Sequence, residues 1–314
     1  MVLKVEGKMV PNEAHESAIW NQLSKSFSDT IKAFQNSIVA VDGGGRSTSS
    51  GLVWRPGVVI TTHHGLRQQE GIEILHTGEP ISGSLIGSDP ATDLAVLRIP
   101  SENLTPVENT ADRSVRVGEV VLSVGRSRLG DISASSGIIA RTGSAWRTWR
   151  GGHIDQLIRP DIRLYVGQAG SALVNEHRQV LGINSPALAR QAVITIPART
   201  IDRIVDAILE RGHAPRPFLG IAMQAVPVPE PVHSLFPADA EHALLVIHVE
   251  QKAPAAQAGV MVGDLVLSLN GEPIQDVREF LHRLAGFRIG DTIALVVIRG
   301  GAKVDLTVGI GDRG

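Results

Sequence analysis

Hydrophobic residues follow different patterns in successive parts of this chain of 314 residues. In residues 13–35 they recur at spacings of three and four, which is the period of an amphipathic helix. From residue 37 to about residue 188 they stand in short runs rich in valine and isoleucine, separated by glycine and proline. Many short strands at such close spacing favour antiparallel barrels or a sandwich over a parallel α/β sheet, which would need intervening helices. The apolar positions of the first stretch are Ile19, Leu23, Phe27, Ile31 and Phe34.

A second helical pattern runs through residues 201–209 and ends near Gly212. Residues 213–217 then read HAPRP, and proline restrains both its own backbone and the residue before it, so we expect a stiff linker there. Strand-like runs resume afterwards, with one helical stretch at residues 277–284. The predicted domains are a helical lead-in (1–36), a β-rich domain (37–212), the linker (213–217) and a second small domain (218–314).

Composition and charge exclude several classes of function. The formal net charge is −2, so nothing indicates a surface for nucleic acid or for anionic lipid. The chain has no cysteine, which excludes disulfides, thiolate catalysis and cysteine-based metal sites but leaves the compartment open. We therefore expect no nucleic-acid partner and no cofactor.

The first residues, MVLKVEGKMVP, are too polar for the apolar core of a secretory signal. No run of about 18 apolar residues predicts a membrane span anywhere in the chain. The printed residues favour the cytoplasm. A chain whose signal had been removed would look the same, which keeps the periplasm or another envelope location open.

Residues 167–175 read GQAGSALVN, the frame of a serine-protease nucleophile loop. Glycines two positions before and one position after the central residue allow a tight turn that aims consecutive backbone N–H groups at one point, as in an oxyanion hole. We expect the N–H groups of Gly167, Gln168 and Ala169 to form it. Ala169 stands where the attacking serine should be, so the hole is predicted and the hydroxyl is absent.

Two further residues complete a catalytic pattern. His64 follows an apolar strand and is the candidate general base. Asp93 precedes another apolar strand and is the candidate acid that orients the imidazole. Taken singly, each is more often a half-buried polar residue or a turn former; together, in the order histidine, aspartate, nucleophile position, they favour the chymotrypsin-like arrangement. The neighbouring pair His63 and His64 has no third ligand nearby, so no metal site is predicted.

With these residues in place, the chain resembles the HtrA (Deg) family of trypsin-like serine proteases over roughly residues 27–310. Residues 60–66, ITTHHGL, are similar to the family's LTNAHVV and place its histidine at His64. Residues 89–99, DPATDLAVLRI, match DPxTDLAVLKI and place its acid at Asp93. The loop matches GNSGGPLVN with departures at Gln168, Ala169, Ser171 and Ala172.

The resemblance implies a mainly β protein, a chymotrypsin-like double β-barrel followed by a PDZ domain, itself a small β-barrel with helices. Residues 253–271 are similar to the PDZ signature SPAAxAGLxxGDxIxxxNG. The implied carboxylate-binding loop is Phe218, Leu219, Gly220 and Ile221, which would hold peptide C-termini by strand addition beside the helix at 277–284. The alternative is that residues 218–314 form a small β-rich domain that binds no ligand.

The family also implies an activity and partners. It is a serine endopeptidase of protein quality control that cleaves unfolded or exposed polypeptides, and its N-terminal segments help to build homotrimers. Its primary specificity pocket falls on Leu164, Ala187 and Leu188, an apolar set that would accept small or medium aliphatic side chains. Arg163 beside it could change that preference.

Ala169 predicts that the chain as written is essentially inactive, because no other group in the constellation can form an acyl-enzyme. Either a serine was replaced in a protease, or this is a natural pseudoprotease that works as a PDZ peptide-binding or oligomeric scaffold. The retained His64 and Asp93 favour the first; the departures at Gln168, Ser171 and Ala172 favour the second.

Overall fold

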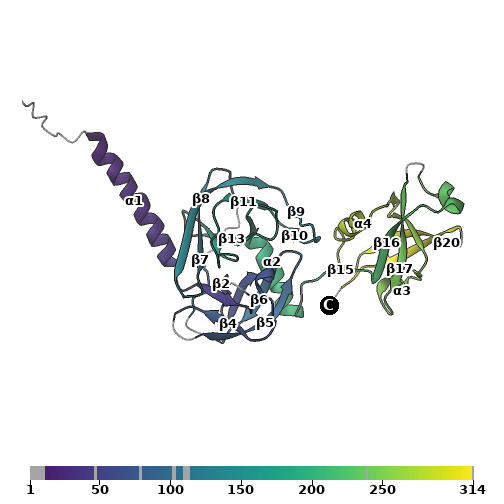
Figure 1. Ribbon diagram of the computed structural model, residues 1–314, viewed down its shortest axis with the longest axis horizontal. Helices are drawn as coiled ribbons and strands as arrows, with labels where there is room; N and C mark the ends of the chain where they lie inside the picture. Colours follow the sequence, from purple (N-terminus) through teal and green to yellow (C-terminus); the bar gives the residue numbers. More distant parts are fainter. Residues whose placement is uncertain are drawn as a thin grey trace, which may run out of the picture. The chain divides into compact units, whose positions relative to one another are not determined.

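The computed structural model describes residues 11–45, 48–77, 80–100, 104–108, 114–237 and 240–312, with side chains from residue 18 onward. The chain divides into two compact units, Met1–Gly212 and His213–Gly314. Strands dominate both units (Figure 1), so the expected mainly β fold is confirmed.

The first unit contains a closed barrel of antiparallel strands in the order β1-β2-β3-β6-β5-β4. Its core includes Val39, Val59, Ile72, Ile74 and Leu97, all inaccessible to solvent. The pairing of β3 with β6 sets Thr62 opposite Leu94, which brings the residues that follow β3 next to those that precede β6. The strands are β1 (Ile38–Asp42), β2 (Ser49–Arg55), β3 (Val58–Thr62), β4 (Ile72–Leu75), β5 (Ile81–Asp89) and β6 (Leu94–Arg98), with a 3-10 turn η1 (His63–Gly65) after β3.

A second closed barrel follows in the same unit, with the strand order β11-β14-β13-β12-β7-β8. Val121, Ile139, Ile158, Leu173 and Leu181 fill its interior. Its strands are β7 (Val120–Arg126), β8 (Ile132–Gly143), β11 (Leu157–Asp161), β12 (Ala172–Asn175), β13 (Val180–Ser185) and β14 (Ile194–Pro197). Between β8 and β11 a short hairpin forms from β9 (Trp146–Arg147) and β10 (His153–Ile154).

Helix α2 (Ala198–Arg211) packs against strands of both barrels, β5 and β6 of the first and β13 and β14 of the second. Its buried face includes Ile201, Ile204, Val205 and Ile208, the positions that the helical period predicted. The helix ends at Gly212, whose left-handed φ of 78° suits glycine and lets its N–H donate to the carbonyl of Ile208.

A buried arginine also joins the two barrels. Arg126, at the end of β7, is 3% exposed. Burial lowers the pKa of its guanidinium, an effect that the carboxylate of Asp131 opposes. It donates to the carbonyls of Ile38, His76, Gln35 and Gly130, so groups from the first barrel, the end of the N-terminal segment and the β7–β8 turn share one cation.

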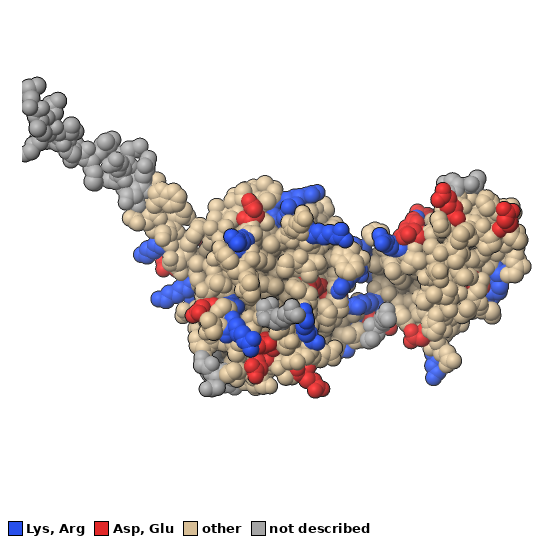
Figure 2. Space-filling view, viewed as in Figure 1, with Lys and Arg blue, Asp and Glu red and all other residues tan. Residues whose placement is uncertain are grey.

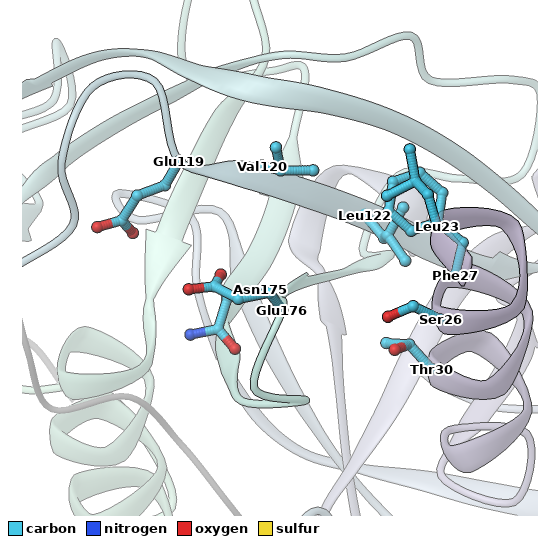
Figure 3. A pocket seen from close by; sticks show the side chains of 9 residues that line it. All are labelled: Leu23, Ser26, Phe27, Thr30, Glu119, Val120, Leu122, Asn175 and Glu176. Atoms are coloured by element: carbon cyan, nitrogen blue, oxygen red, sulfur yellow. The ribbon is translucent and has the colours of Figure 1, made fainter. Parts of the chain in front are cut away.

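Helix α1 (Pro11–Ala33) corresponds to the predicted lead-in, but only its last turns are covered. Thr30 is buried, whereas Ile19, Trp20 and Leu23 are 55%, 70% and 41% exposed. The apolar stripe therefore packs on the described part of the chain at one end only. A cavity of about 350 Å³ lies where α1 meets the second barrel (Figure 3), lined by Leu23, Ser26, Phe27, Thr30, Glu119, Val120, Leu122, Asn175 and Glu176.

The second unit is a sheet in the order β16-β17-β18-β20-β21, with β19 paired to β18. Its core gathers Leu244, Val266, Leu295 and Val308 from the sheet around Phe280 of α4. Asp276 caps α4 by accepting from the N–H groups of Arg278 and Glu279. The remaining elements are β15 (Pro217–Phe218), β16 (Ile221–Pro227), η2 (Glu230–Leu235), β17 (His242–Val249), α3 (Pro254–Gln257), β18 (Leu265–Leu269), β19 (Glu272–Pro273), α4 (Val277–Leu284), β20 (Thr292–Arg299), β21 (Ala302–Gly309) and β22 (Gly311–Asp312).

The segment expected to be a linker is tied to this second unit. His213 Nε2 lies 3.0 Å from a carboxylate oxygen of Asp312, and the N–H of Arg216 donates to the other oxygen at 2.9 Å. Pro217 belongs to β15, which pairs with β22. Residues 213–217 therefore pack as part of the second unit's own edge.

Charged residues of both signs are interspersed over the face of each unit seen in Figure 2. Among the helices that the structure describes, none combines the length and the apolar character needed to cross a membrane.

Candidate active site

His64 and Asp93 meet at one end of the first barrel. His64 lies in η1, directly after β3, and Asp93 lies in the turn that enters β6. The Nδ1 atom of His64 is 2.8 Å and 3.0 Å from the two carboxylate oxygens of Asp93. Asp93 has a φ of 61°, an uncommon conformation for a residue with a side chain, and such conformations cluster at functional sites.

Three donors hold the buried carboxylate of Asp93. Besides the imidazole, the backbone N–H of His64 donates to it at 2.9 Å and the hydroxyl of Ser185 donates at 2.5 Å. The carboxylate thus favours the tautomer with the proton on Nδ1, which leaves Nε2 as the outer nitrogen. Within the described part of the chain, Nε2 has no hydrogen-bond partner, and the side chain of His64 is 37% exposed. Sequence reasoning missed Ser185, because its contact spans 92 positions.

The β9–β10 hairpin supports the turn that carries Asp93. The hydroxyl of Thr148 donates to the carbonyl of Ala91 at 2.6 Å and accepts from the N–H of Gly152 at 3.1 Å. A Cβ atom on Gly152 would stand 2.4 Å from that same carbonyl oxygen, so only glycine fits there. The sequence WRTWR, residues 146–150, forms β9 and the start of the hairpin turn.

The hairpin is in turn fixed to α2. Thr200 donates to Asp155 at 2.7 Å, and Arg203 lies 3.2 Å from the same carboxylate. Burial lowers the pKa of His153, an effect that Asp155 opposes and that Arg203 reinforces. The hairpin therefore connects the Asp93 turn with the helix that both barrels share.

The loop around Ala169 begins with a type II turn over residues 165–168. The N–H of Gln168 donates to the carbonyl of Tyr165 at 3.0 Å, and Gly167 has a φ of 88°. A type II turn needs a positive φ at its third residue, which explains glycine at this position. The side chain of Gln168 closes the same turn from inside, since its Oε1 accepts from the N–H of Tyr165 and its Nε2 donates to Ser133.

Some backbone N–H groups of this loop donate to other residues, and two have no acceptor among the residues described. Gly170 donates to the carbonyl of Asn184, and Ser171 donates to that of Gln168. Among the residues described, the N–H groups of Gly167 and Ala169 have no acceptor. The expectation that the N–H of Gln168 also lines an oxyanion hole needs correction, because the turn itself uses that donor; Gln168 contributes through its side chain instead.

Strand β2 holds this loop by hydrogen bonds and is itself bonded to β3, the strand that precedes His64. The N–H of Ser50 donates to the carbonyl of Ala169 at 2.7 Å, and its hydroxyl donates to that of Gly167 at 2.8 Å. On the neighbouring β3, Thr61 donates to the carbonyl of Ser50. Three residues later stands His64. The structure thus joins His64 directly to Asp93, and it ties the Ala169 loop to β2, which pairs with the strand that leads to His64.

A buried polar network fixes the far side of the loop. The hydroxyls of Ser171 and Ser123 are 2.9 Å apart, and the amide of Asn184 donates to both. Thr195 donates to the carbonyl oxygen of that amide at 2.8 Å. All four side chains are inaccessible to solvent. Ser171, a departure from the family motif, is therefore a structural hydroxyl and is not available as a nucleophile.

The expected specificity residues have unequal exposure. Leu188 is buried, Leu164 is half-buried and Ala187 is exposed, with its N–H donating to Ser185. The Arg163 guanidinium stacks over the ring of Tyr165 at 5.4 Å. The cavity of Figure 3 lies elsewhere, under α1. In the described ranges no three His, Asp or Glu side chains are grouped to hold a metal ion.

The predicted carboxylate loop of the second unit leads into an edge strand. Gly220 has a φ of 77°, and a Cβ on it would stand 2.1 Å from that of Ala253. The carbonyls of Leu219 and Gly220 accept from Ala255 and Glu250, which fixes the loop from behind. Strand β16 follows, pairs on one side with β17 and contacts α4. This is the arrangement that adds a peptide strand beside a helix.

Comparison with protein families identifies both units. A family described as a trypsin-like peptidase domain matches residues 49–183, and a family described as a PDZ domain matches residues 217–310. The chain is 29% identical over 282 residues to "Serine protease Do-like HtrA" of Lactobacillus helveticus, which covers 83% of this chain and 68% of that protein. It is 30% identical over 273 residues to "Probable periplasmic serine endoprotease DegP-like" of Pseudomonas putida, covering 85% of this chain. The chain spans 56% of that relative's length.

Solved structures agree. "HtrA-type protease AlgW with decapeptide" is 25% identical with a TM-score of 0.65, covering 92% of this chain and 99% of that one. The serine endoprotease from Yersinia pestis is 26% identical, also with a TM-score of 0.65, and covers 92% and 98%. A serine-to-alanine form of AlgW with decapeptide has the same score and 26% identity.

Proposed function

The chain belongs to the HtrA (Deg) family of trypsin-like serine proteases with a PDZ domain, and we propose that its first unit is an endopeptidase site inactivated at the nucleophile. His64 is the base, Asp93 the acid that orients it, and the N–H groups of Gly167 and Ala169 form the oxyanion hole. In this form the site binds unfolded or exposed polypeptide segments without cutting them, because Ala169 has no hydroxyl to form the acyl-enzyme.

One observation carries the proposal. His64 and Asp93 form a hydrogen-bonded pair, while the Ala169 loop, which is hydrogen-bonded to β2, has two backbone N–H groups without an acceptor among the described residues. Base, acid and oxyanion hole are what acyl transfer requires besides a nucleophile. These contacts support a serine-protease site that lacks the nucleophile's oxygen atom.

Degradation of casein by this chain and by Ala169→Ser, side by side at neutral pH, tests the proposal. We expect cleavage only by the serine form, with an increase of about a million-fold in kcat, since losing the nucleophile of a triad costs about that much. His64→Ala in the serine form is the matched control and should abolish the gain. No cleavage by a folded Ala169→Ser chain would contradict the proposal.

A pseudoprotease scaffold is the second candidate. It is favoured by Gln168 and Ser171, which differ from the family motif and yet make complete buried hydrogen-bond sets. In this case the working site is the second unit, and an inert Ala169→Ser chain that still binds peptides would support it.

The second unit is proposed to bind peptide C-termini. Phe218, Leu219, Gly220 and Ile221 supply the loop that faces the carboxylate, and the peptide pairs with β16 beside α4. The apolar residues Ile221 and Met223 of β16 and Val277 of α4 lie against the core and suit an apolar side chain. A peptide ending in an amide should bind this unit more weakly than the same peptide with a free carboxylate.

We also propose a homotrimer. The exposed Ile19, Trp20 and Leu23 on α1 would be covered by neighbouring copies. Sedimentation of the chain and of Trp20→Lys over a range of concentrations tests this. A monomer at micromolar concentration would contradict it.

The net charge of −2 and the mixed surface of Figure 2 argue against a nucleic-acid partner. Relatives are named as probable periplasmic proteases, so we adopt the envelope as the working hypothesis, with the cytoplasm as the alternative. Fractionation of cells that express the full gene would decide between them.

A further inference from the structure

We propose that the β9–β10 hairpin and the first turns of α2 form a binding site for a phosphate group. The side chains that would bind it are Arg147 and His153 of the hairpin and Arg203 of the helix. None of them belongs to the candidate active site or to the second unit, so the inference does not depend on the proposed function.

The hairpin sets two basic side chains on one face. Arg147 lies directly opposite His153 in the antiparallel pair of β9 and β10, and Trp146 lies opposite Ile154. Residues that are directly opposite project to the same face, and successive residues project to opposite faces. Ile154 is inaccessible to solvent, whereas the side chain of His153 is 40% exposed. Arg147 and His153 therefore share the outer face of the hairpin.

Helix α2, which lies beside the hairpin in Figure 1, adds a third basic group to this face. The guanidinium of Arg203 donates to the backbone carbonyl of His153 at 2.7 Å, and its side chain is 47% exposed. This hydrogen bond holds the cation at the strand that carries the imidazole. The three basic groups thus form one cluster that solvent can reach.

A single carboxylate does not balance the cluster. An oxygen of Asp155 lies 3.2 Å from the guanidinium of Arg203, and its other oxygen lies 3.6 Å from Nε2 of His153. Arg147 has no carboxylate partner in the described ranges and donates to the carbonyl of Gly151 at 3.0 Å. Two guanidiniums against one carboxylate leave one positive charge in excess, and protonation of His153 would leave two.

The excess charge acts on the groups of the cluster themselves. Burial lowers the pKa of Arg147, and Arg203 lowers it further. Burial also lowers the pKa of His153, an effect that Asp155 opposes and that both arginines reinforce. Like charges directly opposite each other destabilise an antiparallel pair. An anion bound on this face would remove that repulsion.

The donors suit a phosphate better than a carboxylate. The planar fork of a guanidinium matches the oxygens of a phosphate, and the hydrogen bond to Gly151 fixes Arg147 while leaving it further N–H groups for a ligand. A phosphate dianion can balance two positive charges, whereas a carboxylate can balance one. The net charge of −2 favours a soluble phosphate over an anionic lipid surface as its source.

Calorimetric titration of the full chain with inorganic phosphate, and with acetate at the same ionic strength, tests the proposal. We expect one phosphate bound per chain, at least about tenfold tighter than acetate, because the dianion makes more charge-assisted hydrogen bonds. Equal binding of the two anions would overturn the proposal.

Sedimentation with phosphatidylcholine vesicles, with and without phosphatidic acid, distinguishes the sources of the phosphate. Chain that stays in solution in both cases, while inorganic phosphate binds, supports a soluble ligand. Chain that sediments only with phosphatidic acid, through the same arginines, would assign the same phosphate chemistry to a lipid headgroup. Binding of neither inorganic phosphate nor these vesicles would overturn the proposal.

Four variants locate the binding. Arg147→Gln and Arg203→Gln should each weaken phosphate by about tenfold or more, the effect of losing a charged hydrogen bond. Arg98→Gln, at the exposed end of β6, should leave the affinity unchanged. Asp155→Asn should tighten binding, because it raises the excess charge, and a damaged hairpin could not produce this gain. Unchanged affinity in both hairpin and helix arginine variants, or weaker binding by Asp155→Asn, would overturn the proposal.

Nitrogen NMR of the His153 ring gives a separate readout of the location. Sulfate is the probe, because it keeps both charges throughout the range in which imidazole titrates. The charged groups that face His153 are Asp155, Arg147 and Arg203. Sulfate bound among them should raise the pKa of His153 relative to chloride at the same ionic strength, and the exposed His177 between β12 and β13 should not respond. An unchanged pKa of His153 at saturating sulfate would contradict the inference.

Discussion

The two sides of the site differ in what they have kept. On the first barrel, His64 and Asp93 match the family motif and form the hydrogen-bonded pair that the motif implies. On the second barrel, the loop differs from the motif at the nucleophile and at three further residues, yet its type II turn is formed and the N–H groups of Gly167 and Ala169 have no acceptor among the described residues. Backbone geometry can therefore be kept by a different set of side chains, whereas the chemistry of the missing hydroxyl cannot.

Gln168 and Ser171 show how the loop is kept. One satisfies the interior of the turn and the other joins a buried network with Ser123 and Asn184. Buried polar groups need such partners, because an unpaired one costs about 1–3 kcal/mol. The two sides of the site can be compared by removing these residues one at a time.

The largest effect is expected on the first-barrel side. In the Ala169→Ser chain, Asp93→Asn should lower kcat by about 10⁴-fold, since an amide favours the wrong tautomer of His64. Casein hydrolysis measures it, with the exposed Asp305→Asn as control. A loss of less than tenfold would mean that Ser185 and the backbone alone orient the imidazole.

The loop side should respond through stability. Gln168→Leu keeps the shape but leaves the N–H of Tyr165 and the hydroxyl of Ser133 without their partner. We expect the free energy of unfolding to fall by about 1–3 kcal/mol. Urea denaturation of the first unit measures it, and Gln22→Leu on the exposed face of α1 should change it by less than about 0.5 kcal/mol.

A smaller effect is expected at the hairpin. Thr148→Val removes the hydrogen bond to the carbonyl of Ala91 and should cost about 1 kcal/mol, while the exposed Thr307→Val should cost little. Because the Asp93 turn loosens, the His64 ring signals should also broaden. Unchanged His64 signals in a destabilised Thr148→Val chain would show that the hairpin supports the fold alone.

The smallest effect concerns pH. Burial lowers the pKa of both His153 and His76 below the usual 6.5. The unfolded chain then binds more protons than the folded one just below that pH, so stability is full above about 6.5 and falls as the pH drops toward the folded values. Urea midpoints at pH 7.5 and 5.5 measure the loss, and His153→Gln should reduce it.

Much of this was predictable from the sequence. Runs of valine and isoleucine predicted the strands, and the spacing of Ile201, Ile204 and Ile208 predicted α2. Of the three motif positions, His64 and Asp93 form a hydrogen-bonded pair, and the loop of Ala169 is hydrogen-bonded to β2. These succeeded because each depends on a local period or a short motif.

Other features lay beyond the sequence, since they depend on distant partners. Ser185 and Thr148 contact the Asp93 region across 92 and 57 positions. The backbone N–H of Gln168 was expected in the oxyanion hole but closes a turn instead. The turn type depends on φ angles, which cannot be read from the sequence. The period of α1 was correct, but it predicts an apolar stripe and not what covers it, so Ile19 and Trp20 are exposed.

The buried guanidinium of Arg126 has a consequence for how the first unit unfolds. Its acceptors are contributed by the turn that follows α1, by β1, by the β4–β5 connection and by the β7–β8 turn. If either barrel opened alone, this cation would lose part of its coordination while still out of water, which is costly. Amide protons in β1 and β7 should therefore exchange with solvent in one shared event, making the two barrels a single cooperative folding unit.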